Sequence, residues 1–251
     1  MIYDNYKYRI PEGKMVRLIV NTDAKNEGDD QYAIVHALLS PRFDNRGVTA
    51  AHFANDKSSH SMEDSYEEVK KLLGLLRFPE ELAYKGAACQ IPDEKTPVES
   101  EGARLIIEEA MKESDVPLYV IFLGPLTDMA SAYLMEPRIA NRLTCIWIGG
   151  AKYPEGGYEY NLNNDIRAAR VVMNSEIPVW QIPRNVYSQV IVSLAELEYK
   201  VRPCGELGRY LFEQLEEHGH TSFARATTRT GEYWCLGDSP AVGVLLFAHM
   251  Y

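Results

Sequence analysis

Short runs of apolar residues alternate along the chain with longer segments in which apolar residues recur every three or four positions. The short runs are typical of buried strands, and the longer segments are typical of helices that pack on a sheet. Strands are predicted at residues 16–22, 47–53, 118–123, 143–148 and 178–182. Helices are predicted at residues 30–39, 65–76, 102–112, 127–135, 165–173 and 205–217. This alternation predicts an α/β fold with an open, mostly parallel (mixed) sheet flanked by helices, in a Rossmann-like arrangement.

The length of the chain favours a single domain. With 251 residues, 46% of them hydrophobic, it is long enough for one sizeable α/β core and short for two. No repeat, low-complexity tract or linker-like stretch divides it, and the weakest zone is a loop at 86–100 that contains two prolines. One domain over residues 1–251 is therefore predicted.

Charge and cysteine usage narrow the choice of partners. A formal net charge of -10 leaves no excess of Lys or Arg to neutralise phosphates, which argues against nucleic acid and anionic membrane surfaces. The four cysteines are scattered without the CxxC spacing of a zinc or redox site. The N-terminal 14 residues are tyrosine-rich and charged, unlike a signal peptide, and no apolar run approaches membrane-spanning length. We expect a soluble, cytoplasmic protein whose ligand is a small neutral molecule or a cation.

The segment between the first predicted strand and the first predicted helix carries four acidic residues, Asp23, Glu27, Asp29 and Asp30. In an open parallel sheet this position is the crevice at the carboxyl ends of the strands, where ligands bind. A helix N-terminus stabilises one or two carboxylates as caps, which is the ordinary interpretation. A denser carboxylate cluster repels itself unless a hard cation such as Ca²⁺ or Mg²⁺ neutralises it. On this segment alone both interpretations stay open.

Five ordered segments carry a family resemblance. The acidic loop is similar to a motif D-x-D-P-G-x-D-D, although Asn21 replaces the first Asp and the loop from Asp23 to Asp29 is two residues longer and lacks Pro-Gly. Each of the other four segments resembles the family motif that follows it in parentheses. They are HFAND at 52–56 (G-N), LGPLTD at 123–128 (T-G-P-L-T-N), IGG at 148–150 with EYN at 159–161 and Asp165, Ala168 and Ala169 (M-G-G, E-F-N, D-P-E-A-A), and LGDSPAV at 236–242 (H-D-P-x-A-V). Over residues 17–247 the chain thus resembles the nucleoside hydrolases of the inosine-uridine preferring type.

This resemblance implies a Ca²⁺-dependent hydrolase that cleaves the N-glycosidic bond of a ribonucleoside with a metal-activated water. The metal ligands would be Asp23, Asp30, Asp238 and the backbone carbonyl of Leu123, with Asp23 also acting as the catalytic base. The ribose would be bound by Asp29, Asn55, Glu159 and Asn161. The resemblance further implies nucleoside salvage and a homodimer or homotetramer. Family members usually continue beyond the last motif, so a chain that stops at Tyr251 is expected to lack the usual C-terminal extension.

Two departures from the family motifs leave alternatives open. Because Asn21 replaces the first Asp, the chain could be a Ca²⁺-dependent ribose or nucleoside binding protein with weakened turnover. Because Gly237 stands where purine-handling members place a histidine that protonates the departing base, it could hydrolyse another N-riboside, such as nicotinamide riboside. His220, Arg225, Arg229 or Tyr233 could supply a replacement acid. A structural cation site without substrate is a further alternative.

Other chemistry-bearing residues have ordinary explanations. His36 is predicted on the polar face of the first helix, His218 and His220 at a helix end, and His52 and His249 among apolar neighbours. The pair Tyr233-Trp234 could stack on a base, but core packing explains it equally well. No GxGxxG, P-loop, GxSxG or HExxH pattern occurs, which argues against dinucleotide enzymes, kinase-like ATPases, serine hydrolases and zincins.

Overall fold

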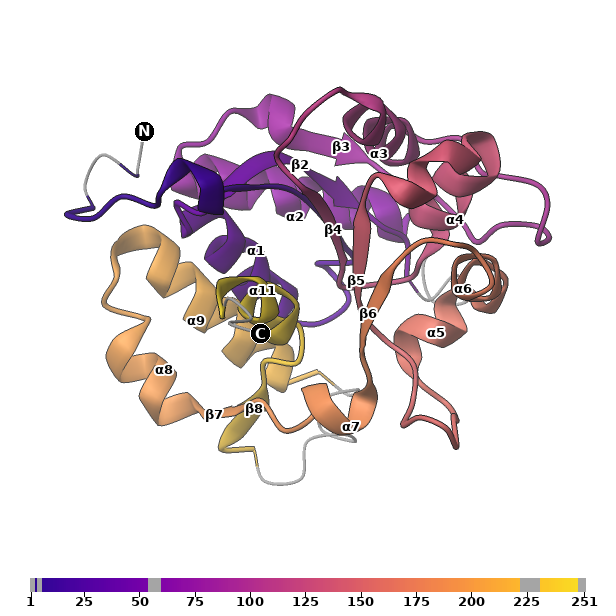
Figure 1. The fold of residues 1–251 in the computed structure, drawn as a ribbon. Coiled ribbons are helices and arrows are strands. Elements are labelled where there is room, and N and C mark those ends of the chain that lie inside the picture. Colours follow the sequence, from indigo (N-terminus) through magenta and orange to yellow (C-terminus); the bar gives the residue numbers. More distant parts are fainter. Residues whose placement is uncertain (1–2, 4–5, 54–59, 222–230, 248–251) are drawn as a thin grey trace.

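A six-stranded parallel sheet forms the centre of the computed structural model, which describes residues 3, 6–53, 60–221 and 231–247 (Figure 1). The strand order is β3-β2-β1-β4-β5-β6, and every pairing in this sheet is parallel. Its strands are β1 (Val16–Thr22), β2 (Phe43–Ala50), β3 (Ala83–Lys85), β4 (Leu118–Phe122), β5 (Thr144–Ile148) and β6 (Val179–Ile182). A separate antiparallel pair consists of β7 (Ile191–Ser193) and β8 (Tyr233–Cys235). The predicted α/β fold with an open, mostly parallel sheet is confirmed.

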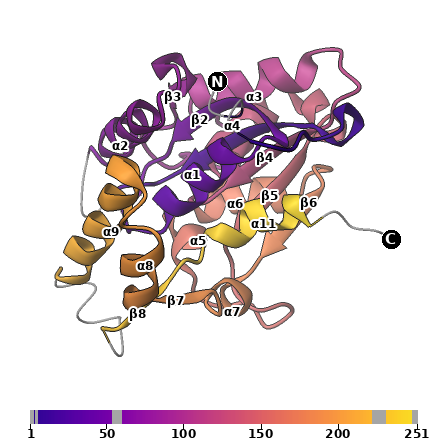
Figure 2. The same cartoon turned by 90° about the vertical axis from the view of Figure 1, so that its left-hand side faces the viewer.

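Helices cover both faces of the sheet (Figures 1 and 2). They are α1 (Asp30–Leu39), α2 (Ser61–Leu76), α3 (Glu101–Met111), α4 (Thr127–Met135), α5 (Tyr160–Asn164), α6 (Ile166–Met173), α7 (Arg184–Tyr187), α8 (Leu194–Lys200), α9 (Gly205–Gly219) and α11 (Ser239–Leu246), with 3₁₀ turns η2 (Glu12–Lys14), η3 (Glu80–Leu82) and η4 (Pro137–Asn141). One buried layer contains residues of α1, α2, α9 and α11, and the other contains residues of α3, α4 and α6. Among the described residues, no helix is long and apolar enough to cross a membrane.

Side chains of the central strands alternate between the two layers. Leu18 and Val20 of β1 pack with α1 and α2, whereas Ile19 between them packs with α3 and α4. In β5, Ile146 joins the first layer and Trp147 the second. Burial on both faces explains why these strands read as continuous apolar runs rather than as alternating ones.

Strand β2 differs most from its prediction. It begins at Phe43 instead of residue 47 and ends at Ala50 instead of residue 53. Its first half carries Asp44, Asn45 and Arg46, so no apolar run marks it, but this half still pairs with β1. Strands β3, β7 and β8 and the short helices α5, α7 and α8 were not predicted, because segments of three to seven residues are too short for a periodic pattern to develop.

The sheet positions the site through its strand order. Strands β1 and β4 are parallel neighbours. From β1 the chain adds β2 and β3 toward one edge of the sheet, and from β4 it adds β5 and β6 toward the other edge, so the order of connection reverses between β1 and β4. Loops that leave the carboxyl ends of two such strands diverge to opposite faces, which opens a crevice for ligands. The acidic loop after β1 and the Leu123-Gly124 turn after β4 meet at this point.

Candidate functional site

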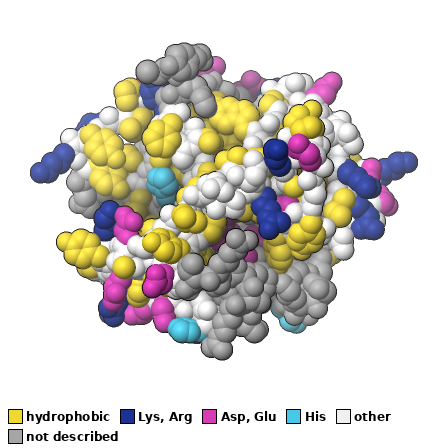
Figure 3. Space-filling model, turned by 90° about the horizontal axis from the view of Figure 1, so that it is seen from below, with side chains coloured by type: hydrophobic (Ala, Val, Ile, Leu, Met, Phe, Trp, Pro, Cys, Tyr) yellow, Lys and Arg dark blue, Asp and Glu magenta, His cyan; other side chains and the backbone are white. Residues whose placement is uncertain are grey.

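A cavity of about 190 Å³ lies at the carboxyl ends of β1, β4 and β5. It is lined by every sequence-predicted site residue that falls within the described part of the chain, namely Asp23, Asp29, Asp30, Leu123, Glu159, Asn161 and Asp238. The eighth, Asn55, lies outside the described residues. Figure 3 views the molecule from below, and acidic side chains lie near the middle of that face beside the grey atoms. Segments more than 200 residues apart in the chain therefore meet in one acidic cavity.

Three of the carboxylates form a compact cluster. Asp29, Asp30 and Asp238 each offer an oxygen, and these oxygens lie within 4.8 Å of one another. Asp30 is the first residue of α1, and Asp29 and Asp238 are the residues immediately before α1 and α11. All three are buried, and burial, followed by repulsion from neighbouring acids, raises the pKa of Asp29 and Asp238 well above the ordinary value. Burial also raises the pKa of Asp30 to about 6, even though the Thr22 hydroxyl donates a hydrogen bond to its carboxylate. Three deprotonated carboxylates in this cluster would repel one another, and a bound cation would relieve that repulsion.

Asp23 faces the same cavity and is 2% exposed. Its Oδ2 is buried and has no hydrogen-bond partner among the described residues. Burial, and then the charge of Asp30, raises its pKa well above the ordinary value. A buried carboxylate oxygen without a donor is unfavourable unless a cation or ligand approaches it. The donor set is oxygen only, which fits a hard divalent ion such as Ca²⁺ or Mg²⁺.

The turn after β4 fits around this carboxylate. A Cβ atom at Gly124 would lie 2.7 Å from Asp23 Oδ1, closer than any side chain tolerates. The backbone of Gly124 does not have a positive φ, so the glycine is required by the close approach and not by its own conformation. Gly124 is therefore explained by its contact with Asp23, and not only by its place in a Gly-Pro turn.

Asn161 connects the ends of β4 and β5. Its Nδ2 donates to the carbonyl of Leu123 at 2.6 Å and to the carbonyl of Ile148 at 2.9 Å. Two carbonyl acceptors fix the orientation of the amide, so Oδ1 is the atom left for a ligand. A carbonyl oxygen has two lone pairs, and that of Leu123 can still serve as a metal ligand.

Glu159 is held from three sides and is 1% exposed. Its Oε2 accepts from the backbone N–H of Leu162 at 2.9 Å, which caps α5, and from that of Gly150 at 2.8 Å. Its Oε1 accepts from the Tyr187 hydroxyl at 2.9 Å. Tyr187 also lines the cavity, and burial and the Glu159 charge raise the pKa of its hydroxyl. Sequence reasoning missed Tyr187, for which the only signal was its place just after a strand end.

Asn21, the departure from the opening motif, is buried outside the cavity lining. Its Nδ2 donates to Thr49 Oγ1 at 2.7 Å and to Asp128 Oδ2 at 2.8 Å. Asp128 is itself a departure, because it stands where the T-G-P-L-T-N motif ends in Asn. Relative to the two motifs, the acid and the amide have changed places, and in this chain the two side chains are hydrogen-bonded with Asn21 as the donor.

The lengthened acidic loop is tied to α2 and α9 through Glu68, which is 4% exposed. Glu68 accepts from Lys25 Nζ at 3.2 Å, from Gln31 Nε2 at 3.3 Å and from the Tyr210 hydroxyl. Gln31 Nε2 also donates to the carbonyl of Ala24 at 2.6 Å. These contacts order a loop that lacks the Pro-Gly of the motif.

Several residues of the matched segments are structural. The Thr127 hydroxyl lies 2.9 Å from His52 Nε2 and donates to Asp165 Oδ2 at 2.9 Å, and Asp165 caps α6 through the N–H of Ala168. His52 is fully buried, as predicted.

The structure does not bring His220 or Tyr233, the two described residues among the suggested replacement acids, to the cavity. His220 is exposed beside Glu216, and Tyr233 is 50% exposed; neither lines the cavity. Arg225 and Arg229 lie outside the described residues.

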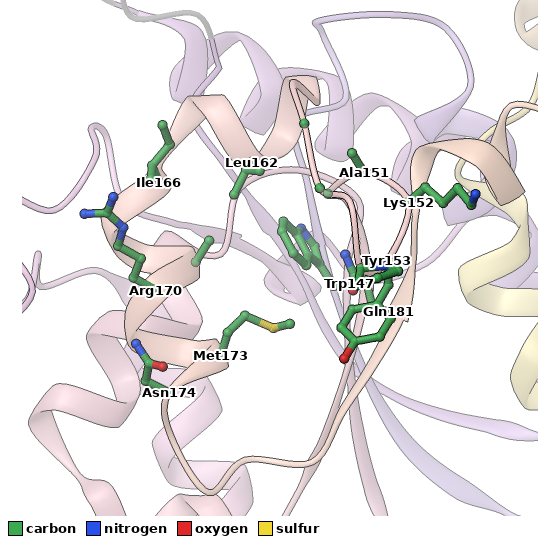
Figure 4. Close-up of a pocket in the computed structure, with 15 residues that line it drawn as sticks. Trp147, Ala151, Lys152, Tyr153, Leu162, Ile166, Arg170, Met173, Asn174 and Gln181 are labelled. Atoms are coloured by element: carbon green, nitrogen blue, oxygen red, sulfur yellow. The ribbon is translucent and has the colours of Figure 1, made fainter.

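A second cavity, of about 380 Å³, lies between β5, β6 and α6 (Figure 4). Trp147, Leu162 and Met173 give it an apolar lining, and Lys152 and Arg170 stand at its margin. No carboxylate belongs to its described lining, so the candidate metal ligands and the candidate base lie in the acidic cavity.

Comparisons with known proteins agree with this arrangement. The family model described as inosine-uridine preferring nucleoside hydrolase matches residues 18–251. A pyrimidine-specific ribonucleoside hydrolase of Salmonella paratyphi A is 24% identical over 196 residues, 68% of this chain and 61% of that protein. One from Escherichia coli O139:H28 is 30% identical over 116 residues, 43% of this chain and 37% of that protein. The chain thus spans less than two thirds of the length of these relatives.

Solved structures share the fold. A purine-preferring ribonucleoside hydrolase from Gardnerella vaginalis superposes with a TM-score of 0.76 at 21% identity, covering 92% of this chain and 80% of that chain. An inosine-uridine preferring nucleoside hydrolase from Bacillus anthracis superposes with a TM-score of 0.64 at 17% identity, covering 92% and 82%.

Proposed function

Because the chain belongs to the family of inosine-uridine preferring nucleoside hydrolases, we propose that it hydrolyses the N-glycosidic bond of a ribonucleoside with one bound Ca²⁺. The observation that carries this proposal is the buried Asp23 Oδ2, which has no donor among the described residues and faces three further carboxylates. Such an arrangement is unfavourable as four anions and becomes favourable around a hard cation.

Asp23, Asp30, Asp238 and the carbonyl of Leu123 would hold the ion. When bound, Ca²⁺ neutralises the carboxylates and lowers the pKa of a water molecule beside them. Asp23 accepts a proton from the attacking water. The water oxygen forms a bond to C1′ of the ribose while the C1′–N bond breaks. The electron pair of the C1′–N bond leaves with the base. The surrounding carboxylates stabilise the positive charge that develops on the sugar.

Asp29, Glu159 and Asn161 are proposed to bind the ribose. Asp29 lies in the cluster, Glu159 is held rigidly by three donors, and Asn161 has Oδ1 available. Asn55, from outside the described residues, is proposed as a fourth contact. Acceptors of this kind reject a sugar that lacks a hydroxyl, since they would be left buried and unpaired.

The test is release of ribose from inosine, adenosine, uridine, cytidine and p-nitrophenyl riboside, with Ca²⁺ and with a chelator. We expect Ca²⁺-dependent release, and much slower cleavage of the matched 2′-deoxyribosides. Tight binding of nucleosides without release would instead indicate the Ca²⁺-dependent binding protein. No binding and no release from any of these substrates would refute both.

Metal analysis after mild dialysis tests the cofactor independently. We expect about one Ca²⁺ per chain, because one cluster with one ligand set is proposed. Stoichiometric zinc would contradict an oxygen-only site.

We also propose a homodimer or homotetramer that acts in nucleoside salvage in the cytoplasm. Light scattering coupled to size-exclusion chromatography tests the assembly, and a monomer at micromolar concentration would contradict it.

A further inference from the structure

Tyr187 and Gly237 meet at the wall of the acidic cavity. Tyr187 is the last residue of α7, and Gly237 precedes Asp238 at the start of α11. A Cβ atom at Gly237 would lie 3.0 Å from Tyr187 Cδ2, and 3.4 Å from both Asp29 Oδ2 and Cys235 Sγ. The phenol ring thus occupies space that a side chain at position 237 would need.

This packing, and not the backbone conformation, disfavours a side chain at position 237, because the ring of Tyr187 would have to shift by a few tenths of an ångström to admit even a Cβ atom. Gly237 is absent from the described glycines with positive φ, which include Gly150, Gly156 and Gly231. Other residues could adopt its backbone conformation. A large side chain at 237, which needs far more room than a Cβ atom, is therefore expected to fit better beside a smaller residue at 187, and the two positions are coupled through shared volume.

The hydroxyl of Tyr187 is already engaged. It donates its hydrogen to Glu159 Oε1 at 2.9 Å, and Glu159 Oε2 is occupied by two backbone N–H groups. Transfer of that hydrogen to a leaving base would leave a phenolate against a carboxylate, which is electrostatically unfavourable. No histidine belongs to the described lining of the cavity.

We propose that Tyr187 takes the place of a side chain at position 237 and holds Glu159 without protonating the leaving group, so that the described wall of the cavity supplies no acid and the site selects N-ribosides whose leaving group departs without a proton. The inference rests on the proposed function and names its substrate class. Tyr187 is a specificity-determining and positioning residue in this scheme, and its ring, more than its hydroxyl, sets the leaving-group preference.

The experiment measures kcat/KM for inosine, uridine, nicotinamide riboside and p-nitrophenyl riboside. General acid assistance is typically worth about 10²- to 10⁴-fold, so the natural nucleosides should fall behind the two activated substrates by roughly that factor. Tyr187→Phe should leave the ratio between substrates unchanged and raise KM roughly threefold to tenfold for all of them, because Glu159 loses one donor. A general loss of structure would lower kcat. It would not raise KM equally for all substrates while the ratio of kcat/KM between substrates stays the same.

Three further variants test whether positions 187 and 237 share one volume. Tyr187→Ala opens the space without adding an acid, and it is the matched control for the double variant Tyr187→Ala/Gly237→His. We expect the double variant to raise the inosine to p-nitrophenyl riboside ratio at least roughly tenfold over the control. Gly237→His alone should impair all substrates alike, because the ring of Tyr187 blocks the new side chain.

Three results would contradict the inference, and one of them would also contradict the proposed function. If Tyr187→Phe slows inosine selectively by tenfold or more, Tyr187 is the acid and the inference fails. Fast inosine turnover by the unaltered protein also overturns it, while leaving the proposed function intact. If not even p-nitrophenyl riboside is cleaved, the proposed function fails, and the inference fails with it.

Discussion

The side-chain amide of Asn21 donates a hydrogen bond of 2.8 Å to the carboxylate of Asp128, and this contact links the end of β1 to the start of α4. Asp128 is 1% exposed and also accepts from the N–H of Ala87 and the hydroxyl of Ser100. The replacement of the first motif Asp by Asn is therefore matched by the reverse replacement at position 128. Asn21 lies outside the lining of the acidic cavity, so its role in this structure is to hold Asp128.

Asn21→Asp is expected to destabilise the protein, because two buried carboxylates would face each other at hydrogen-bond distance. The loss should exceed about 2 kcal/mol in the free energy of unfolding, as for other buried polar groups left without a partner. The double variant Asn21→Asp/Asp128→Asn should recover most of this loss. Urea unfolding of both single variants and the double variant gives the coupling energy. A double variant as unstable as the sum of the two single ones would contradict the exchange.

Calcium is expected to stabilise the protein in a pH-dependent way. The raised pKa of Asp30, about 6, and the raised pKa values of Asp23, Asp29 and Asp238 mean that the folded protein binds more protons than the unfolded chain. Without metal, stability should therefore fall as the pH rises from about 4 through 6 and beyond. With Ca²⁺ this loss should disappear above pH 6, since the deprotonated carboxylates become ligands.

Thermal unfolding in chelator and in Ca²⁺, between pH 5 and 8, measures this effect. At a hundredfold excess over Kd the expected gain at pH 7.5 is about 2.7 kcal/mol. That gain corresponds to roughly 5 to 10 °C in a domain of this size. A metal-free stability that rises with pH over this range would count against the buried cluster.

Much of this site could be predicted because its residues are close in sequence to strong patterns. Strand β1 is buried along its whole length and contains the apolar run 18–20, helix α1 has its predicted bounds, and the acids lie between or at the start of these elements. The carboxyl end of a parallel strand is where ligands bind, so Asp23, Asp29 and Asp30 could be named as candidates from their position, whereas their separate roles came from the family resemblance.

The remaining residues depend on contacts that local pattern does not encode. Tyr187 ends a helix of four residues, and its partner Glu159 is 28 positions away. Asn21 and Asp128 are 107 positions apart, so Asn21 was visible as a departure from its motif but its pairing with Asp128 was not. The predicted start of β2 failed for a related reason, because pairing with β1, not hydrophobicity, defines its polar first half.

Asp23→Asn is expected to abolish turnover while the fold stays intact. The change removes the proposed base and weakens the metal site, so kcat should fall by roughly 10³-fold or more. In chelator the variant should be at least as stable as the unaltered protein, because an amide replaces a buried carboxylate oxygen without a donor. Asp115→Asn, at an exposed loop before β4, is the matched control and should change neither property. Near-normal activity of Asp23→Asn would show that the mechanism is wrong.

Gly124→Ala tests whether the orientation of Asp23, and not its charge alone, matters. The added Cβ would lie 2.7 Å from Asp23 Oδ1 and 3.2 Å from Asp23 Cβ, so the carboxylate must move, while the backbone of residue 124 accepts alanine without strain. A displacement near 1 Å at a reacting group can lower activity about 10²-fold, and we expect kcat/KM to fall by tenfold to roughly that factor, together with a weaker Ca²⁺ affinity. Gly74→Ala is the matched control, since its Cβ meets nothing within 4 Å and it lies in helix α2. It should retain full activity and gain about 0.5–1 kcal/mol of stability, because alanine favours the helix. If Gly124→Ala binds Ca²⁺ and turns over substrate like this control, the close approach of the turn to Asp23 has no part in catalysis.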